Sequence, residues 1–301
     1  MNVVIRVNDE IKEKMIEYYK DKRRDKVIPY VVFQAQEEDT VITMYESGKV
    51  MFQGTSADVD AAMWGVALEN TKEAKEEKKK SNQQYYHCSA VGSDEVGTGD
   101  YFGPIVVSSA YVSKENIPWL EELGVKDSKK LTDDKILEIV PQIVKKIPYK
   151  SMILTNKEYN ERYSADNNMN KLKAILHNNV LVKLTSEIRD YDYVIVDEFA
   201  KKNVYFSYLK ESNNVFRNIT FMTKGEDKSL AVACASMISR FIFIKEFDKL
   251  GDKIDEFLPK GAGDAVNEIG KKIVDKYGDD ILRDIAKLNF KNTEKILEKE
   301  Q

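Results

Sequence analysis

The chain has 301 residues, of which 42% are hydrophobic and 33% are charged, and its formal net charge is −4. This composition is that of a soluble globular protein, long enough for two domains. It argues against a membrane span, because no apolar run is long enough, and against a disulfide framework or zinc site, because Cys88 and Cys234 are the only cysteines. The N-terminus has no secretory leader pattern, so we expect a cytoplasmic protein.

The N-terminal third predicts a small α+β domain. Residues 3–7 form an apolar strand pattern, and Asn8 is placed to cap a helix over residues 9–22. Three alternating stretches and a further helical stretch follow, at residues 30–36, 40–45, 49–53 and 58–68. This order of helix, three strands and helix leaves one sheet face available for binding, so we expect an N-terminal domain over residues 1–69.

Residues 70–83 are the expected boundary between the domains. The stretch 70–82 has many charges and no large apolar residue, which predicts a solvated linker or a helical extension. A polar helix face and a basic tether to nucleic acid are both compatible with this composition.

The remainder, residues 84–301, predicts a mixed α/β domain with C-terminal helices. Strands are expected at residues 86–93, 104–112, 151–155, 193–196 and 215–222, and helices at residues 167–189, 228–250, 264–277 and 278–298. Strands interleaved with helices in this way favour a layered sheet with helices packed on it.

The stretch G-S-D-E-V-G-T-G-D-Y-F-G-P, residues 92–104, places two acids before a glycine-rich run. It lacks the Lys-Ser/Thr of a phosphate-binding loop, and Pro104 begins a strand rather than the helix of a dinucleotide fingerprint. We therefore consider Asp94 and Glu95 as metal ligands, with a solvated polar strand end as the alternative. Adjacent strand residues point to opposite faces, so the two acids are expected to converge only where the strand ends and twists before Gly97 and Gly99.

Two further acids lie at the ends of predicted elements. Asp197 ends the apolar run Y-V-I-V-D, and Glu226 and Asp227 precede a long apolar helix, where Asp227 is expected to be a helix cap. Caps and solvated strand ends remain the alternative for any one of them. Carboxylates without histidine or cysteine pairs select hard ions, so the set predicts Mg²⁺ or Mn²⁺ and phosphodiester hydrolysis.

The chain resembles the type 2 ribonucleases H and, within them, the ribonuclease HIII family. The matching motifs follow the family's order through the second domain: G-S-D-E-V-G-T-G-D-Y-F-G-P (92–104), G-V-K-D-S-K-K-L-T-D (124–133), V-D-E (196–198), K-G-E-D-K-S-L-A-V-A-C-A-S-M-I-S-R (224–240), L-P-K-G-A-G (258–263) and A-K-L-N-F-K-N-T (286–293). The resemblance implies a ribonuclease H-like fold that cleaves the RNA strand of RNA–DNA hybrids with two metal ions, leaving 5′-phosphate and 3′-hydroxyl ends.

Carried over residue by residue, the resemblance implies that Asp94, Glu95, Asp197 and Glu226 are the catalytic metal ligands. It implies that Asp94 bridges both ions and that Asp197 completes the water-activating site. The substrate-binding residues that it implies or suggests are Gly97, Thr98 and Gly99 at the ribose 2′-hydroxyl, and Ser128, Lys129 and Lys130 at the phosphate.

Ribonuclease HII, the closest rival family, incises at single ribonucleotides in duplex DNA. It has Asp where this chain has Glu226 and Arg where this chain has Thr98, so both positions favour HIII. Asn289 stands where family members commonly have histidine, which leaves that position without an assigned role. A hybrid-binding protein without catalysis and a small-molecule phosphatase are the rivals from other classes.

The N-terminal domain also resembles that of ribonuclease HIII, which is similar to the TATA-box-binding protein fold. Such a sheet could lie on the minor groove of a hybrid duplex, and the basic cluster Lys20, Lys22, Arg23, Arg24 and Lys26 could contact phosphates or simply be solvated. We expect a monomer. His177 is expected to be a packed helix residue rather than a catalytic base.

Overall fold

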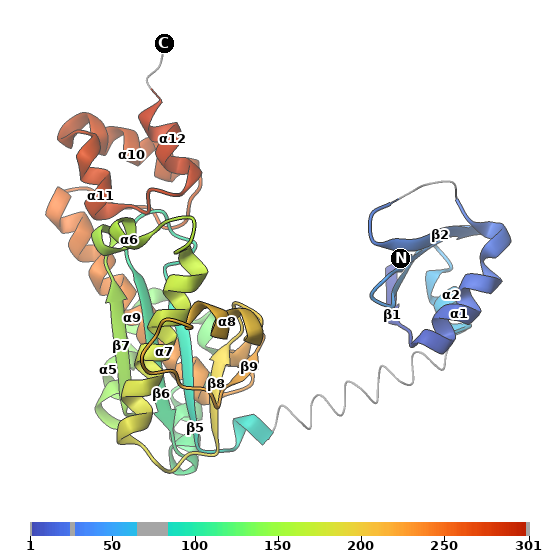
Figure 1. Ribbon diagram of the computed structural model, residues 1–301, viewed down its shortest axis with the longest axis horizontal. Coiled ribbons are helices and arrows are strands. Elements are labelled where there is room, and N and C mark those ends of the chain that lie inside the picture. The colour runs from blue at the N-terminus through green and yellow to red at the C-terminus, as the bar shows by residue number, and fades with distance from the viewer. Residues whose placement is uncertain (1, 25–27, 65–83, 299–301) are drawn as a thin grey trace. The chain divides into compact units, whose positions relative to one another are not determined.

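The computed structural model describes residues 2–24, 28–64 and 84–298. The chain forms two compact units, Met1–Asn82 and Gln83–Gln301, each drawn in Figure 1. The predicted linker over residues 70–83 lies outside the described residues. Among the described helices, none combines the length and the apolar character that crossing a membrane would require.

The N-terminal unit is a four-stranded antiparallel sheet in the order β1-β4-β3-β2. Its elements are β1 (Asn2–Arg6), α1 (Asp9–Tyr18), the 3₁₀ turn η1 (Lys20–Lys22), β2 (Val31–Glu37), β3 (Thr40–Tyr45), β4 (Lys49–Gln53) and α2 (Ala57–Ala62). This confirms the predicted order. The predicted helix at residues 9–22 ends earlier, because the chain tightens into η1 after Tyr18, and Asn8 caps its start by accepting from the Ile11 amide at 2.9 Å.

One face of this sheet is covered by the two helices. The helices contribute to one buried cluster with the strands. Its helix residues are Met15 of α1, Tyr19 directly after α1, and Ala57 and Ala61 of α2. The opposite face carries a cross-strand row that the register places side by side, namely Val4, Met51, Thr43 and Gln34. Among the described residues, the two helices pack on the other face only. On this face Val4 is exposed, Met51 and Gln34 are half-buried and Thr43 is buried.

The C-terminal unit is built on a five-stranded mixed sheet in the order β7-β6-β5-β8-β9. Its strands are β5 (Ala90–Val96), β6 (Ile105–Val112), β7 (Tyr149–Leu154), β8 (Tyr193–Asp197) and β9 (Thr220–Met222). β5, β8 and β9 are parallel, whereas β6 pairs antiparallel with both β5 and β7. The strand predicted at 86–93 begins later, because residues 84–86 are helical, and the one predicted at 215–222 shrinks to three residues.

Helices flank this sheet and continue beyond it. They are α4 (Ile117–Glu122), α5 (Asp133–Lys146), α6 (Asn156–Arg162), α7 (Met169–Glu187), α8 (Lys202–Tyr208), α9 (Leu230–Ile254), α10 (Asp264–Tyr277), α11 (Leu282–Ile285) and α12 (Lys291–Leu297), with 3₁₀ turns η2 (Lys114–Asn116), η3 (Val125–Lys130), η4 (Gly225–Asp227) and η5 (Asp279–Ile281). The helix predicted at 278–298 is broken instead. Ala286 is extended there because it pairs with Phe102 as an isolated bridge.

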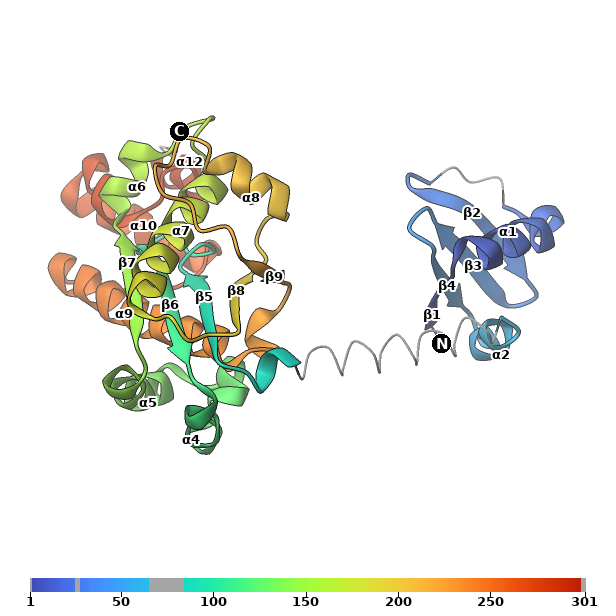
Figure 2. The ribbon, with the colours of Figure 1, turned by 60° about the horizontal axis from the view of Figure 1, so that its bottom comes forward.

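Helices α9 and α7 lie on opposite faces of the sheet, and β5 is between them (Figure 2). The side chains of β5 alternate between these two helices. Gly92 faces the α9 backbone, while Val91 packs in a cluster with Ala174 and Leu181 of α7. Consecutive side chains of β5 therefore enter two different environments.

Gly92→Ala is expected to destabilise the C-terminal unit, because a Cβ at this position would lie 2.2 Å from the backbone of Ala231 and Val232. Overpacking of this kind costs about 1–3 kcal/mol or more. Urea unfolding measures the loss. Gly99→Ala is the matched control, since no atom lies within 4 Å of its added Cβ. Equal stability of the two variants would show that α9 can move away from β5 at little cost.

Candidate active site

The predicted acid pair lies within β5, and the two side chains point to opposite faces of the sheet. The strand continues through Val96, so it does not end and twist at the acids as predicted. Glu95 contacts Lys173 and His177 of α7, whereas Asp94 lies beside Ser236 of α9. The regular alternation of a strand, rather than a turn, therefore positions the two carboxylates.

Both oxygens of Glu95 are held by one helix. Lys173 Nζ donates to Oε1 at 2.8 Å, and His177 Nε2 is 2.9 Å from Oε2. The two donors are four residues apart on α7, so they lie on the same helix face one turn apart. His177 Nδ1 is also 2.7 Å from Ser93 Oγ, which orients its ring.

Phe199 covers this pair of donors. Its ring stacks on His177 with centroids 5.1 Å apart, and the Lys173 ammonium lies 4.2 Å from its centroid. We call Lys173, His177 and Phe199 the Glu95 clamp. Burial alone would raise the pKa of Glu95, but the hydrogen bond and charge of His177, followed by those of Lys173, outweigh it and lower this pKa to about 2.

Asp94 is in the opposite electrostatic situation. Its carboxylate is buried, with 8% exposure, and its Oδ1 accepts from the Glu95 amide at 2.8 Å. Burial, followed by repulsion from Glu95 and then from Asp197, raises the pKa of Asp94 well above its ordinary value. A neighbouring hydroxyl, that of Ser236, offsets only part of this effect. The site is therefore short of positive charge at Asp94.

Asp197 joins Asp94 because β8 runs parallel to β5. The register pairs Ser93 with Val196, and the next residues along the two strands are Asp94 and Asp197. The Gly225 amide donates to Asp197 Oδ1 at 2.6 Å, so the turn η4 is attached directly to this carboxylate. Glu226, half-buried, is the next residue of that turn.

The charges of Glu95 and Asp197 thus both act on Asp94. Glu226 directly follows Gly225, the residue whose amide binds Asp197. Asp227 does not cap the following helix, because the N-cap of α9 is Ser229. Its expected role is therefore corrected. Within the described part of the chain, no three acidic, histidine or cysteine side chains form a ready-made metal-binding group.

The candidate substrate residues lie on two segments beside the acids. Gly97, Thr98 and Gly99 follow β5 directly, with Thr98 half-buried and Gly99 exposed. Ser128 is buried and Lys130 exposed in η3, a turn that packs against α9 and η4. The Lys129 side chain lies outside the described residues.

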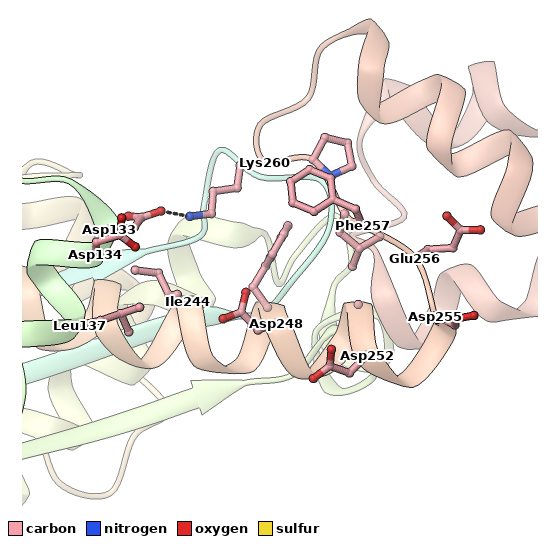
Figure 3. A pocket seen from close by; sticks show the side chains of 14 residues that line it. Asp133, Asp134, Leu137, Ile244, Asp248, Asp252, Asp255, Glu256, Phe257 and Lys260 are labelled. Atoms are coloured by element: carbon pink, nitrogen blue, oxygen red, sulfur yellow. Dashed lines mark hydrogen bonds and ion pairs between the residues drawn. The ribbon is translucent and has the colours of Figure 1, made fainter.

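A cavity of about 960 Å³ has a lining that includes none of these groups (Figure 3). It is lined by Asp133, Asp134, Leu137, Ile244, Phe247, Asp248, Gly251, Asp252, Asp255, Glu256, Phe257, Leu258, Pro259 and Lys260, and Asp133 forms an ion pair with Lys260. None of the four predicted acids lines it. Chemistry rather than cavity size therefore identifies the candidate site.

The N-terminal basic cluster is partly neutralised within its own unit. Lys22 forms an ion pair with Glu37, and Lys20 lies 3.7 Å from Glu17. The Arg23 guanidinium donates to the Ile16 carbonyl at 3.0 Å. These contacts support a solvated face for this cluster, while Lys26 lies outside the described residues.

Sequence reasoning did not identify the Glu95 clamp. His177 is fully buried on α7, as predicted for a packed helix residue, but it also stacks on Phe199 and contacts a candidate catalytic acid. Lys173 belongs to no motif that marks it as a site residue. The usable signal is their i, i+4 spacing in an otherwise apolar helix, because two polar residues on one buried face require a buried partner.

The donor set suits a hard divalent cation. Carboxylate oxygens are the ligands that Mg²⁺ and Mn²⁺ prefer. The repulsion that raises the pKa of Asp94 is the interaction that a cation among these carboxylates would relieve. The residues present therefore fit such an ion.

Comparison with known proteins connects this site to a family. The sequence model of the ribonuclease HII family matches residues 91–293, and residues 2–80 match a domain of unknown function, DUF3378. Ribonuclease HIII of Bacillus cereus is 41% identical, with 98% of each chain covered.

Solved structures agree with these sequence matches. The crystal structure of Bst-RNase HIII in complex with Mn²⁺ has a TM-score of 0.70 and 37% identity, covering 99% of this chain and 98% of that one. The ribonuclease H2 of Pyrococcus horikoshii matches at a TM-score of 0.58 with 26% identity and covers 69% of this chain and 96% of its own. The predicted fold class is therefore confirmed, and because the curated and solved HIII proteins match along almost the whole chain, including its N-terminal unit, the chain belongs to the ribonuclease HIII family.

Proposed function

We propose that this protein hydrolyses the RNA strand of RNA–DNA hybrid duplexes and leaves 5′-phosphate and 3′-hydroxyl ends. The observation that carries the proposal is the placement of Asp94 and Asp197 at neighbouring positions of the adjacent strands β5 and β8, with Glu95 next to Asp94, in a chain of the ribonuclease HIII family. A carboxylate buried beside two others, as Asp94 is, is costly for folding, so a function must retain it.

Asp94, Glu95, Asp197 and Glu226 would hold the divalent cations, which we propose to be two Mg²⁺ or Mn²⁺ ions. Such ions supply Lewis-acid activation of water and stabilise the leaving oxygen of an in-line displacement. The Mn²⁺ complex of Bst-RNase HIII supports metal binding in this family. The chain's own contribution is to keep Glu95 ionised and oriented through Lys173 and His177.

Recognition of RNA would come from the segments beside the acids. The backbone of Gly97, Thr98 and Gly99 would contact the 2′-hydroxyl, the group that distinguishes RNA from DNA. Lys129 and Lys130, with Ser128, would hold the substrate phosphate. The position of η3 against η4, which carries Glu226, supports this assignment.

The N-terminal domain, residues 1–69, would bind the duplex through the free face of its sheet, as the TATA-box-binding protein fold does with DNA. In the row of Val4, Met51, Thr43 and Gln34, Val4 is 49% exposed and Met51 and Gln34 are half-buried, whereas Thr43 is buried and accepts a hydrogen bond from Gln34. The wide minor groove of a hybrid displays sugar hydroxyls that such a row can contact. Residues 70–83 would be the linker and residues 84–301 the catalytic domain.

We also infer that the protein acts in the cytoplasm as a monomer. Two buried thiols, Cys88 and Cys234, are compatible with a reducing compartment, and the site draws all its candidate ligands from one chain.

Purified protein with Mg²⁺ or Mn²⁺ is expected to cut an RNA–DNA hybrid and to leave duplex DNA with a single embedded ribonucleotide largely intact. Thr98 and Glu226, in place of the arginine and aspartate of ribonuclease HII, are the reason for this preference. Labelled strands resolved by denaturing electrophoresis measure both substrates side by side.

The Asp94→Asn variant is the control for a contaminating nuclease. Equal cutting of both substrates would show an activity of the ribonuclease HII type. It would also show that Thr98 and Glu226 do not determine the substrate preference. Binding of the hybrid without cutting, in either metal, would replace the proposed enzyme by a hybrid-binding protein.

A further inference from the structure

Lys287 is a fully buried lysine between α11 and α12, outside the acid site. Its Nζ donates to two backbone carbonyls, those of Asp100 at 2.6 Å and Gly103 at 2.5 Å. Its own amide donates to the Tyr101 carbonyl at 2.9 Å. All three acceptors belong to the loop between β5 and β6, which begins at Gly97.

Neighbouring residues attach the same loop at further points. The Gly103 amide donates to Ile285 O at 3.0 Å, and Asn156 Nδ2 donates to Gly103 O at 2.9 Å. On the other side, the Gly261 amide donates to Asp100 Oδ1 at 2.6 Å, and the Tyr101 amide to Gly261 O at 2.8 Å. Residues 100–103 are therefore held by C-terminal segments and by α6 rather than by the sheet.

This attachment is transmitted to the residues proposed to contact the 2′-hydroxyl. Gly97 has φ +96°, and a Cβ there would lie 2.1 Å from the Pro104 carbonyl, so the two ends of the loop touch. The ends of the loop touch and residues 100–103 are held in place. Thr98 and Gly99 therefore connect two fixed points, Gly97 and Asp100, and this restricts the directions of their amides. A shift of Asp100 would rotate their amides.

A buried amine is unfavourable unless it has partners. Burial lowers the pKa of Lys287 to about 7, against a smaller opposing effect of Asp100. Whether charged or neutral, the amine carries at least two N–H groups for its two carbonyls. An apolar side chain would remove the Nζ donor from the Asp100 carbonyl and leave the Gly103 carbonyl with Asn156 alone, which explains why a lysine occupies a core position.

We propose that Lys287 is a positioning residue, which fixes the loop 97–104 so that the amides of Gly97, Thr98 and Gly99 face the ribose of the substrate. The role in cleavage rests on the proposed function, whereas the role in loop order does not. Lys287 acts through the loop and touches none of the four acids.

Lys287→Met tests the proposal, with Lys291→Met as the matched control on exposed α12. Hydrogen exchange of the full-length, metal-free protein is expected to show amides of residues 97–103 exchanging about tenfold faster or more, since the loop loses the two hydrogen bonds that Lys287 Nζ donates to its carbonyls. With hybrid substrate, kcat is expected to fall about 10- to 100-fold while KM changes little. The increase in Tm caused by Mn²⁺ should be retained, because the carboxylates are untouched.

Lys287→Gln, which keeps an amide donor, should restore part of the loop protection, and it replaces Lys287→Met in the assay if the latter does not fold. Unchanged exchange in residues 97–103 would overturn the inference even if the wild-type protein cuts hybrids. Faster exchange with unchanged kcat would overturn the link from Lys287 to cleavage. A wild-type protein that does not cut hybrids would contradict the proposed function, and the exchange result would still decide the role of Lys287 in the loop.

Discussion

Asp94→Asn is expected to abolish hybrid cleavage and, in metal-free buffer at pH 7, to raise the thermal unfolding midpoint. The pKa of Asp94 is raised in the folded protein, chiefly by burial and then by Glu95. The protonated carboxyl therefore favours the fold at acidic pH, and this contribution is lost as pH rises through the folded-state pKa. At neutral pH the wild-type protein carries the cost of the buried charge, and asparagine does not.

A gain of about 1–3 kcal/mol is expected for removing such a charge, and each kcal/mol corresponds to about 2–4 °C in Tm for a domain of this size. Differential scanning calorimetry with and without Mn²⁺ measures the effect. Mn²⁺ should stabilise the wild-type protein more than the variant. Asp248→Asn, an exposed acid on α9, is the control and should change neither stability nor activity. A less stable Asp94→Asn protein would show that this carboxylate serves the fold rather than the site.

Lys173→Met is expected to have the opposite effect on stability and also to reduce kcat. It removes one of the two donors to Glu95 and leaves a carboxylate whose side chain is only 11% exposed next to Asp94. Truncating one partner of a buried pair costs about 3–5 kcal/mol. A misplaced catalytic carboxylate costs about 10- to 100-fold in rate.

The pH dependence gives a second measurement for Lys173. Because the pKa of Glu95 is lowered by its clamp, its contribution to stability is present above the ordinary carboxyl pKa and is lost as pH falls toward about 2. Lys173→Met should therefore lose less stability than the wild-type protein over this acidic range. Lys171→Met is the matched control, because the Lys171 Nζ lies 3.8 Å from an oxygen of Glu211, which is exposed. Identical acid unfolding of Lys173→Met and the wild-type protein would mean that His177 alone maintains Glu95.

Much of the fold followed from local patterns. The predicted helix at 264–277 has the bounds of α10, and the strands at 40–45 and 49–53 have those of β3 and β4. These elements are amphipathic or alternating, so their own residues determine both their period and their ends. α5 carries a similar local signal, because Thr132 caps it and one buried face is formed by Ile136, Ile139, Val140 and Ile143.

The break between α11 and α12 could not be read in this way. Residues 286–290 have no glycine or proline, so local propensity favours a continuous helix. Backbone pairing of Ala286 and Lys287 with Phe102 and Tyr101 interrupts it. Contacts with a distant part of the chain decide the conformation there.

By itself, the sequence determined the family, the order of the elements and the residue types at the candidate site, because acids after apolar runs and motifs in fixed order are local properties. Only the tertiary structure decided which charges meet. Glu95 finds Lys173 78 residues away, and Lys287 reaches the Asp100 carbonyl 187 residues away. The physical reason is that the energy of a buried charge depends on its partners in space, and packing of α7 and the C-terminal segments brings those partners to β5 and its loop.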